Sequence, residues 1–373
     1  MPACSVSKRT GFFSDPAPAI IPPVTDLTGV TLKEFEAQCV ADGLQRWRAR
    51  PILQWIHRKG ALSFEEMTDL SKESRGEFAE RYPIFSTKVT ERVKSPDGTR
   101  KLLLDLGKGE VIESVLIPEG DRRTICISTQ VGCPVRCVFC ASGMDGLKRN
   151  LTTSEMVEQV LYVKKESDRP ITNLVVMGIG EPLLNYANLV RALRILKASW
   201  GGGFGYNRIT LSTVGVLDKI EQLVEDKVTP NLAISLHAPN NKIRHVVVPT
   251  MKNRKVTELI KAGMAYKEAT GKNVTFEYVL LAGVNDEKKH ALELGARLRN
   301  TRMKINIIPF NRVEELPYES PTNESVDRFV ETIGKCGALV TVRKRKGDEV
   351  SAACGQLRAK FVQKKSNGDE NAD

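Results

Sequence analysis

The stretch Gly132-Cys133-Pro134-Val135-Arg136-Cys137-Val138-Phe139-Cys140 carries three thiols at the spacing C-x3-C-x2-C. It follows a strand-like run, Thr124-Ile125-Cys126-Ile127-Ser128. Gly132 and Pro134 favour a loop over a regular helix or strand. Because three thiols on one loop can converge on a single inorganic centre, the stretch predicts that Cys133, Cys137 and Cys140 are metal ligands.

Three interpretations of this loop are open. A structural zinc ion takes four protein ligands, and no fourth Cys or His lies near the triplet in sequence, so zinc would need a distant ligand. Three reduced core thiols are the second interpretation, although buried structural cysteines do not gather on a Gly/Pro loop. A ferredoxin-type iron–sulfur cluster takes four cysteines. Three would leave one iron of a [4Fe–4S] cluster open to a small-molecule ligand, and we favour this third interpretation.

Size, charge and cysteine content restrict the class of protein. The chain has 373 residues, 41% hydrophobic and 27% charged, enough for one large domain and a small one. It has no apolar run long enough to span a membrane and no signal-peptide segment, so a cytoplasmic protein with no membrane partner is expected. Its eight cysteines fit a reducing compartment. A net charge of +11 indicates a polyanionic partner such as nucleic acid, although surplus surface lysine would give the same charge.

The order of patterns divides the chain into six segments. Amphipathic helical patterns dominate the second segment, where we assign Trp47 and Trp55 to the core and Arg46 and Lys59 to phosphate contacts. The predicted segments are a disordered arm (1–28), a helical accessory domain that binds RNA (29–86), a β-hairpin and strand extension (87–121), an α/β domain of alternating strands and helices (122–345), a C-terminal loop with a short helix (346–363) and a disordered tail (364–373).

From residue 122 strand-like and helical patterns alternate. The predicted strands are Thr124–Ser128, Asn173–Met177, Arg208–Ser212, Leu232–Leu236, Val274–Leu280 and Ile305–Pro309. The predicted helices between them are Thr153–Lys165, Asn188–Lys197, Lys219–Asp226, Thr257–Thr270 and Glu287–Arg299. This alternation predicts a parallel sheet with right-handed crossovers, either doubly wound or a barrel. In both cases the carboxyl ends of the strands form the rim of the active site.

Polar residues stand at four successive strand ends. They are Gly180-Glu181 after Met177, Ser212, the run Ser235-Leu236-His237, and Asn311 after Phe310. A Gly-Glu-Pro loop is often only a turn, and His237 could be a hydrogen-bonded structural histidine. Because all four lie at neighbouring strand ends, we expect one polar pocket, in which Glu181 could accept from an ammonium group.

These motifs together resemble those of a known family. The runs 130–140, 177–185, 211–215, 233–239, 304–311 and 352–357 are similar to the RlmN-type RNA adenine carbon-2 methyltransferases of the radical S-adenosylmethionine (radical SAM) superfamily. The resemblance covers roughly residues 30–360. It implies a six-stranded partial (β/α) barrel with a small N-terminal helical accessory domain.

The resemblance also implies roles for individual residues. Cys133, Cys137 and Cys140 would ligate the [4Fe–4S] cluster, and S-adenosylmethionine would bind Gly180, Glu181, Ser212, Ser235, Leu236, His237 and Asn311. Cys354 would carry the methyl group, Cys126 would form a transient disulfide with it, and Glu113 would accept the ring proton. Two molecules of S-adenosylmethionine would be used per turnover.

The implied partners are 23S ribosomal RNA, transfer RNA at the adenosine 3′ of the anticodon, and a flavodoxin-like or other electron donor, with the protein a monomer. The basic run Arg343–Lys346 beside Cys354 would hold RNA phosphates. One alternative is methylation at carbon 8, the resistance type, which Pro182 after Glu181 disfavours. The other alternative is an RNA-binding assembly factor whose cluster is only structural.

Overall fold

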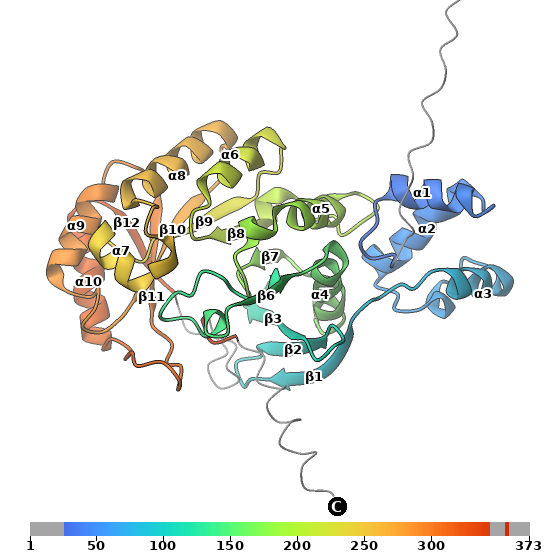
Figure 1. Cartoon of the computed structure of the whole chain (residues 1–373), viewed down its shortest axis with the longest axis horizontal. Helices are drawn as coiled ribbons and strands as arrows, with labels where there is room; N and C mark the ends of the chain where they lie inside the picture. The colour runs from blue at the N-terminus through green and yellow to red at the C-terminus, as the bar shows by residue number, and fades with distance from the viewer. Residues whose placement is uncertain (1–25, 344–354, 358–373) are drawn as a thin grey trace, which may run out of the picture.

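The computed structural model describes residues 26–343 and 355–357. The predictions made for Cys354, Arg345 and the two chain ends therefore lie outside the described residues. In Figure 1 helices α1–α3 lie on one side of the molecule, and helices α6, α8, α9 and α10 cover the outer side of the sheet at the opposite side. None of the helices formed by the described residues is long and apolar enough to cross a lipid bilayer.

Within the described residues, ten strands form one open sheet in the order β1-β2-β3-β4-β7-β8-β9-β10-β11-β12. The strands are β1 (Lys88–Lys94), β2 (Arg100–Asp105), β3 (Val111–Glu119), β4 (Arg122–Ile127), β7 (Asn173–Val176), β8 (Ile209–Thr213), β9 (Asn231–Ser235), β10 (Val274–Leu280), β11 (Lys304–Pro309) and β12 (Leu339–Val342). Strands β1 to β4 pair antiparallel, and every pair from β4 to β12 is parallel. The six predicted strands are thus β4 and β7–β11, and β12 extends this partial barrel at its edge.

Helices connect the parallel strands as the alternation predicted. They are α4 (Thr153–Lys165), α5 (Tyr186–Lys197), α6 (Leu217–Glu225), α7 (Asn241–Val247), α8 (Val256–Thr270), α9 (Lys288–Leu298) and α10 (Asn323–Lys335). Helix α4 has its predicted bounds, because Thr152 and Glu155 form a capping box at its start. Helices α7 and α10 were not predicted, although α10 buries Val326, Phe329 and Ile333 at helical spacing.

Strand alternation separates the core from the site. On β10, Phe276, Tyr278 and Leu280 are fully buried in the main apolar core. The residues between them, Glu277 and Val279, point to the opposite face and line a cleft. The concave face of the sheet is therefore the face that carries polar side chains.

The N-terminal helices form a small module with its own aromatic centre. Its elements are α1 (Leu32–Ala41), a 3-10 turn (Arg46–Arg48), α2 (Ala49–Gln54), a π-helical turn (Trp55–Lys59), a second 3-10 turn (Phe64–Glu66) and α3 (Lys72–Arg81). Phe35 packs edge-on against Tyr82 with ring centroids 5.3 Å apart. The assignment of Trp47 to the core is wrong, since 65% of its surface is exposed. The aromatic rings of α1 and α3 fill the centre of the module and leave Trp47 outside it.

The predicted disordered arm overlaps the ordered chain. Leu27 and Thr28 are fully buried, although both fall inside the predicted segment 1–28. The Leu27 N–H donates to the Pro83 carbonyl (3.0 Å), and the Thr28 hydroxyl donates to the buried carboxylate of Glu158 on α4 (2.9 Å). These long-range partners order residues whose local sequence has little periodicity.

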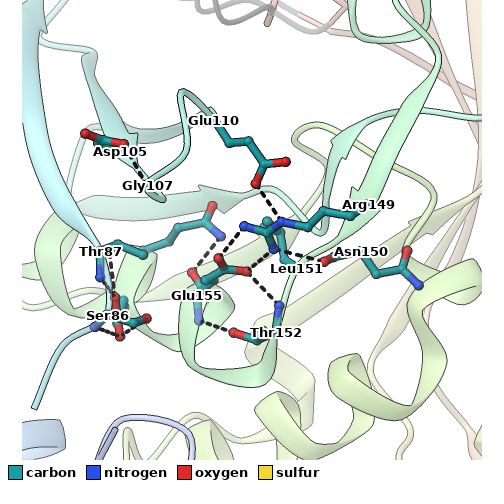
Figure 2. Close-up of polar contacts among 12 residues, drawn as sticks. Ser86, Thr87, Asp105, Gly107, Glu110, Arg149, Asn150, Leu151, Thr152 and Glu155 are labelled. Atoms are coloured by element: carbon teal, nitrogen blue, oxygen red, sulfur yellow. Dashed lines mark hydrogen bonds and ion pairs between the residues drawn. The ribbon is translucent and has the colours of Figure 1, made fainter. Parts of the chain in front are cut away.

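A second contact joins the cysteine-loop hairpin to the strand extension. The hairpin consists of β5 (Gln130–Gly132) and β6 (Leu147–Asn150). Figure 2 shows the Arg149 guanidinium between Glu110, which precedes β3, and Glu155 in the first turn of α4. The nitrogen–oxygen distances are 2.6 Å to Glu110 and 2.7 Å to Glu155. This bridge holds the hairpin on the barrel next to the strand that carries Glu113.

Candidate active site

The cysteine loop leaves the barrel through a strained turn. Gly132 has a φ of 75°, and a Cβ built on it would lie 1.9 Å from the Gly146 carbonyl oxygen, so only glycine fits. The Cys133 N–H donates to the same carbonyl (2.9 Å). The loop is therefore closed at its base, as the Gly/Pro pattern predicted.

The three cysteines pack against one apolar cluster of buried residues. Burial raises the pKa of Cys133 to about 12, and the charge of Cys140 adds to this effect. Burial also raises the pKa of Cys137 well above its ordinary value, with further contributions from Cys140 and Cys133. Free thiols here would stay neutral, whereas a bound metal centre would ionise its ligands.

The thiol arrangement bears on the choice of metal. Within residues 26–343 and 355–357, no three His, Cys, Asp or Glu side chains are placed to hold one metal ion. Structural zinc takes four protein ligands, whereas three cysteines can each bind one iron of a [4Fe–4S] cluster and leave the fourth iron open. The donor set of three neighbouring thiols in an apolar loop fits a cluster better than zinc.

One cleft lies between this loop and the strand ends. It is lined by five of the predicted site residues, which are Cys140, Ser212, Ser235, His237 and Asn311. The prediction that polar residues at neighbouring strand ends share one pocket is therefore met by side chains from β8, from β9 with the residues after it, and from the loop after β11. Among the described residues, the other predicted site residues stand outside this lining: Glu113, Cys126, Cys133, Cys137, Gly180, Glu181 and Leu236.

His237 has a defined orientation. Its backbone lies in the left-handed region (φ 55°), and its Nδ1 accepts a hydrogen bond from the Val279 N–H (3.0 Å). Burial lowers the pKa of His237 to about 3, so the ring is neutral. A neutral ring that accepts at Nδ1 carries its proton on Nε2, and it is therefore a hydrogen-bond donor at that atom.

Glu181 is buried, and its carboxylate is already engaged. Its oxygens accept hydrogen bonds from the Thr213 hydroxyl (2.7 Å) and the N–H groups of Leu183 (3.1 Å) and Val214 (2.8 Å). Burial raises the pKa of Glu181 to about 7. Gly180 before it has a φ of 113° and packs against Gln130, where a Cβ would meet a side-chain carbon at 2.7 Å. Gly180 and Glu181 therefore pack between β5 and the end of β8.

Leu236 takes part in the hydrogen bonds around the site through its backbone N–H and carbonyl groups, not through its side chain. The side chain is fully buried in the main core, its N–H donates to the Glu277 carbonyl (3.0 Å), and its own carbonyl accepts from Arg244 (2.6 Å). The predicted run Ser235-Leu236-His237 is therefore held by β10 on one side and by α7 on the other.

Glu113 and Cys126 occupy one face of the sheet. Cys126 pairs with Val115 across β3 and β4, and Glu113 lies two residues before Val115, so the two side chains point the same way. The Lys101 ammonium lies 2.9 Å from a Glu113 carboxylate oxygen, with Glu113 only 2% exposed. Glu113 and Cys126, two of the three predicted catalytic residues, thus lie on the concave face of the sheet, outside the lining of the cleft.

The described residues after Cys354 pack against the site. Gly355 lines the cleft, and its carbonyl accepts from the Ala141 N–H (2.8 Å). The Leu357 carbonyl accepts from the Ser142 hydroxyl (2.7 Å). Leu357 shares an apolar cluster with Cys126, Val115 and Ile179. Segments more than 200 positions apart in sequence therefore meet beside the cysteine loop.

The sequence analysis did not predict that Glu277 and Arg343 line the cleft. The Glu277 carboxylate accepts from Asn306 (2.8 Å), and burial raises its pKa while the charge of Arg343 opposes that effect. A carboxylate inside an otherwise apolar strand was the available signal. Arg343 was assigned to RNA phosphates, but it lines the same cleft near Met177.

Two family models match this chain. The radical SAM superfamily model matches residues 127–295, and the model of the ribosomal RNA large subunit methyltransferase N-terminal domain matches residues 25–84. A Thermotoga sp. (strain RQ2) protein named "Probable dual-specificity RNA methyltransferase RlmN" is 43% identical over 342 residues, which is 91% of this chain and 99% of that protein. The chain belongs to the RlmN family of radical SAM RNA methyltransferases.

A second sequence relative and one solved structure are also similar to this chain over most of its length. The Rhodopirellula baltica protein of the same name is 41% identical, covering 90% of this chain and 91% of its own. A crystal structure of a radical SAM methyltransferase from Sphaerobacter thermophilus is 43% identical with a TM-score of 0.87, covering 90% of this chain and all of that one. Membership of the RlmN family implies a [4Fe–4S] cluster and S-adenosylmethionine as cofactors.

Proposed function

We propose that this RlmN-family protein methylates carbon 2 of one adenosine in 23S ribosomal RNA and of the adenosine 3′ of the anticodon in transfer RNA. Cys133, Cys137 and Cys140 would hold the cluster. Bound there, S-adenosylmethionine supplies both a methyl group and the radical chemistry that an electron-poor ring carbon requires. Two molecules are used per turnover, one for each purpose.

The observation that carries this proposal is the position of Gly355. This residue, bonded to Cys354, lines the same cleft as Cys140, and Leu357 packs with Cys126. The Cys354 thiol would take a methyl group as a thioether. The radical chemistry that S-adenosylmethionine supplies would remove one hydrogen atom from this methyl group, so that its carbon bonds to carbon 2 of the adenine and links the protein to the RNA. One electron would return to the cluster, and the ring proton would pass to Glu113. The Cys126 thiol then attacks the Cys354 sulfur, which forms a disulfide and releases the methylated base. Two electrons must reduce that disulfide before the next turnover.

Glu113 is the base of the reaction in this proposal. The Lys101 ammonium at 2.9 Å stabilises its carboxylate form, which is the form that accepts a proton. Glu113 lies on the same sheet face as Cys126, one strand away. The proton leaves the ring at the carbon that was methylated, so a carboxylate on the concave face is suitably placed.

The cofactor contacts are the polar groups at the strand ends. Ser212, Ser235, His237 and Asn311 share the cleft, and His237 offers an Nε2–H donor. Gly180, Glu181 and Leu236 would complete the cofactor site. The Glu181 N–H donates to Gln130 Oε1 (2.8 Å), and the Leu236 N–H donates to the Glu277 carbonyl (3.0 Å). We also propose a cytoplasmic monomer that takes electrons from a flavodoxin-like or other reductant.

The test is anaerobic reconstitution with iron and sulfide, followed by incubation with S-adenosylmethionine, reductant and unmodified ribosomal or transfer RNA. Mass spectrometry of the digested nucleosides should show 2-methyladenosine from both RNAs. 8-Methyladenosine would show the resistance-type activity instead. RNA binding without consumption of S-adenosylmethionine would show an assembly factor and overturn the proposal.

A further inference from the structure

Arg244 on α7 is a buried cation without an anionic partner. It is fully buried, and within residues 26–343 and 355–357 no carboxylate forms an ion pair with it. Its guanidinium donates to the carbonyl oxygens of Val214 (2.7 Å), Ser235 (2.8 Å) and Leu236 (2.6 Å). Its Nε has no hydrogen-bond partner. Burying an uncompensated charge is costly, so a site that retains one indicates a missing negative charge.

Helix α7 lies directly on the cysteine loop. The Val138 N–H donates to the Val247 carbonyl (3.1 Å), and the Thr250 hydroxyl donates to the Val135 carbonyl. Val135, Phe139, Val214 and Val247 form one apolar cluster, against which Cys133, Cys137 and Cys140 pack. The cation and the three thiols therefore share a low-dielectric region, where charges interact strongly.

We infer that Arg244 is a positioning residue whose fixed positive charge balances the cysteine-ligated cluster and makes its reduction easier. This inference rests on the cluster that family membership implies, and it does not depend on which RNA atom is methylated. A cluster held by three thiolates is anionic, and reduction adds one more negative charge. A nearby cation stabilises the reduced form more than the oxidised form, so it raises the reduction potential.

The experiment compares Arg244→Gln and Arg244→Lys with the unmodified protein, each reconstituted anaerobically with iron and sulfide. Glutamine removes the positive charge but keeps an amide group that can donate to the strand-end carbonyls. Lysine keeps the positive charge but loses the several N–H donors of the planar guanidinium. The control is Arg254→Gln, because Arg254 is half-exposed and lies 3.9 Å from Asp218. Iron per chain and the midpoint potential, from a redox titration followed by electron paramagnetic resonance, are measured without RNA.

Arg244→Gln should bind less iron. Its ratio of reduced to oxidised cluster at a fixed solution potential should fall about tenfold, which is 59 mV for one electron. Arg244→Lys and Arg254→Gln should keep the potential of the unmodified protein. An unchanged potential in folded Arg244→Gln would show that Arg244 only ties the strands together and would overturn the inference. If Arg244→Gln does not fold, Arg244→Lys becomes the test. A folded lysine variant keeps the positive charge, so a lower iron content or a lower midpoint potential in it would contradict a role for charge.

Discussion

The Ala141 N–H donates a hydrogen bond to the Gly355 carbonyl, with 2.8 Å between nitrogen and oxygen. Ala141 directly follows the last cysteine of the loop, and Gly355 directly follows Cys354. One backbone contact therefore ties the chain beside the proposed cluster to the chain beside the proposed methyl carrier. Methyl transfer to the Cys354 thiol needs such proximity, because a reactant fixed close to its partner has already paid the entropic cost of being positioned.

The roles of the two non-cluster thiols can be separated. Cys126→Ala should retain iron, accept a methyl group on Cys354 and stall as a covalent protein–RNA adduct, since only Cys126 can release the base. Cys354→Ala should form no adduct. Radiolabelled RNA on a denaturing gel measures both, and Cys39→Ala, which changes a buried cysteine of the N-terminal module, is the control. Normal turnover by Cys126→Ala would contradict the two-thiol mechanism.

The anchor of the C-terminal segment should govern methyl loading. Ser142→Ala removes the donor to the Leu357 carbonyl, a buried hydrogen bond whose loss costs about 1–3 kcal/mol. We expect the rate of Cys354 methylation, followed by peptide mass spectrometry, to fall several-fold while the iron content stays constant. The matched control is Thr332→Ala, which loses a hydroxyl-to-carbonyl bond on the exposed face of α10. If Cys354 were methylated at the same rate in Ser142→Ala and Thr332→Ala, the hydrogen bond from Ser142 to Leu357 would have no role in methyl transfer.

Glu181 should make the stability of the cofactor-free protein depend on pH. Burial raises the pKa of Glu181 to about 7 from an ordinary value of 4.5. Between these values the folded protein holds a proton that the unfolded chain releases, so the unfolding free energy decreases as pH rises through this window. The full effect is on the order of 3 kcal/mol.

Glu181→Gln tests this dependence, because the amide does not titrate. The variant should be less stable at low pH, since its NH₂ group faces the N–H of Leu183 or Val214, but its stability should change less between pH 4.5 and 7. Chemical denaturation at several pH values measures both quantities. A variant whose pH dependence equals that of the unmodified protein would show that Glu181 is not the titrating group.

RNA binding should depend on exposed, unpaired cations of the N-terminal module. Two of the predicted phosphate contacts have partners in the structure, Arg46 with Glu36 (2.8 Å) and Lys59 with Asp69 (3.2 Å). Arg50 and Arg58 are exposed and form no ion pair with any described residue. Replacing both by alanine should lower the slope of log K against log salt by roughly one per contact.

Trp47 should act differently from these cations. It is 65% exposed with the Arg48 guanidinium 5.7 Å from its ring centroid, so Trp47→Ala should weaken binding by about 1–3 kcal/mol through lost stacking without changing the salt slope. Arg328→Ala is the control for the salt titrations, because Arg328 lies on α10 and pairs with Glu324 (2.8 Å). A salt slope that stays constant in the double variant would remove Arg50 and Arg58 from the interface.

Local spacing determined much of what the sequence predicted about this protein. The loop of Cys133, Cys137 and Cys140 depends on nine consecutive residues, and the alternation of strands and helices depends on periods of two and 3.6. Ser212, Ser235, His237 and Asn311 were predicted to meet because the carboxyl ends of parallel strands share one edge. All of these rules use only neighbours in sequence and the general topology of parallel sheets.

Strand register and the packing of distant segments decided where Arg244, Glu277 and Trp47 lie. Arg244 lies against β8, β9 and the cysteine loop only because α7 folds back over them, and no local pattern marks it. Glu277 reaches the cleft because β10 turns its odd-numbered residues to the concave face, whereas Trp47 lies outside because other aromatic rings fill the module. The sequence by itself determined which residues could take part in the chemistry. The tertiary structure decided which of them meet, because burial and charge compensation depend on segments that are distant along the chain.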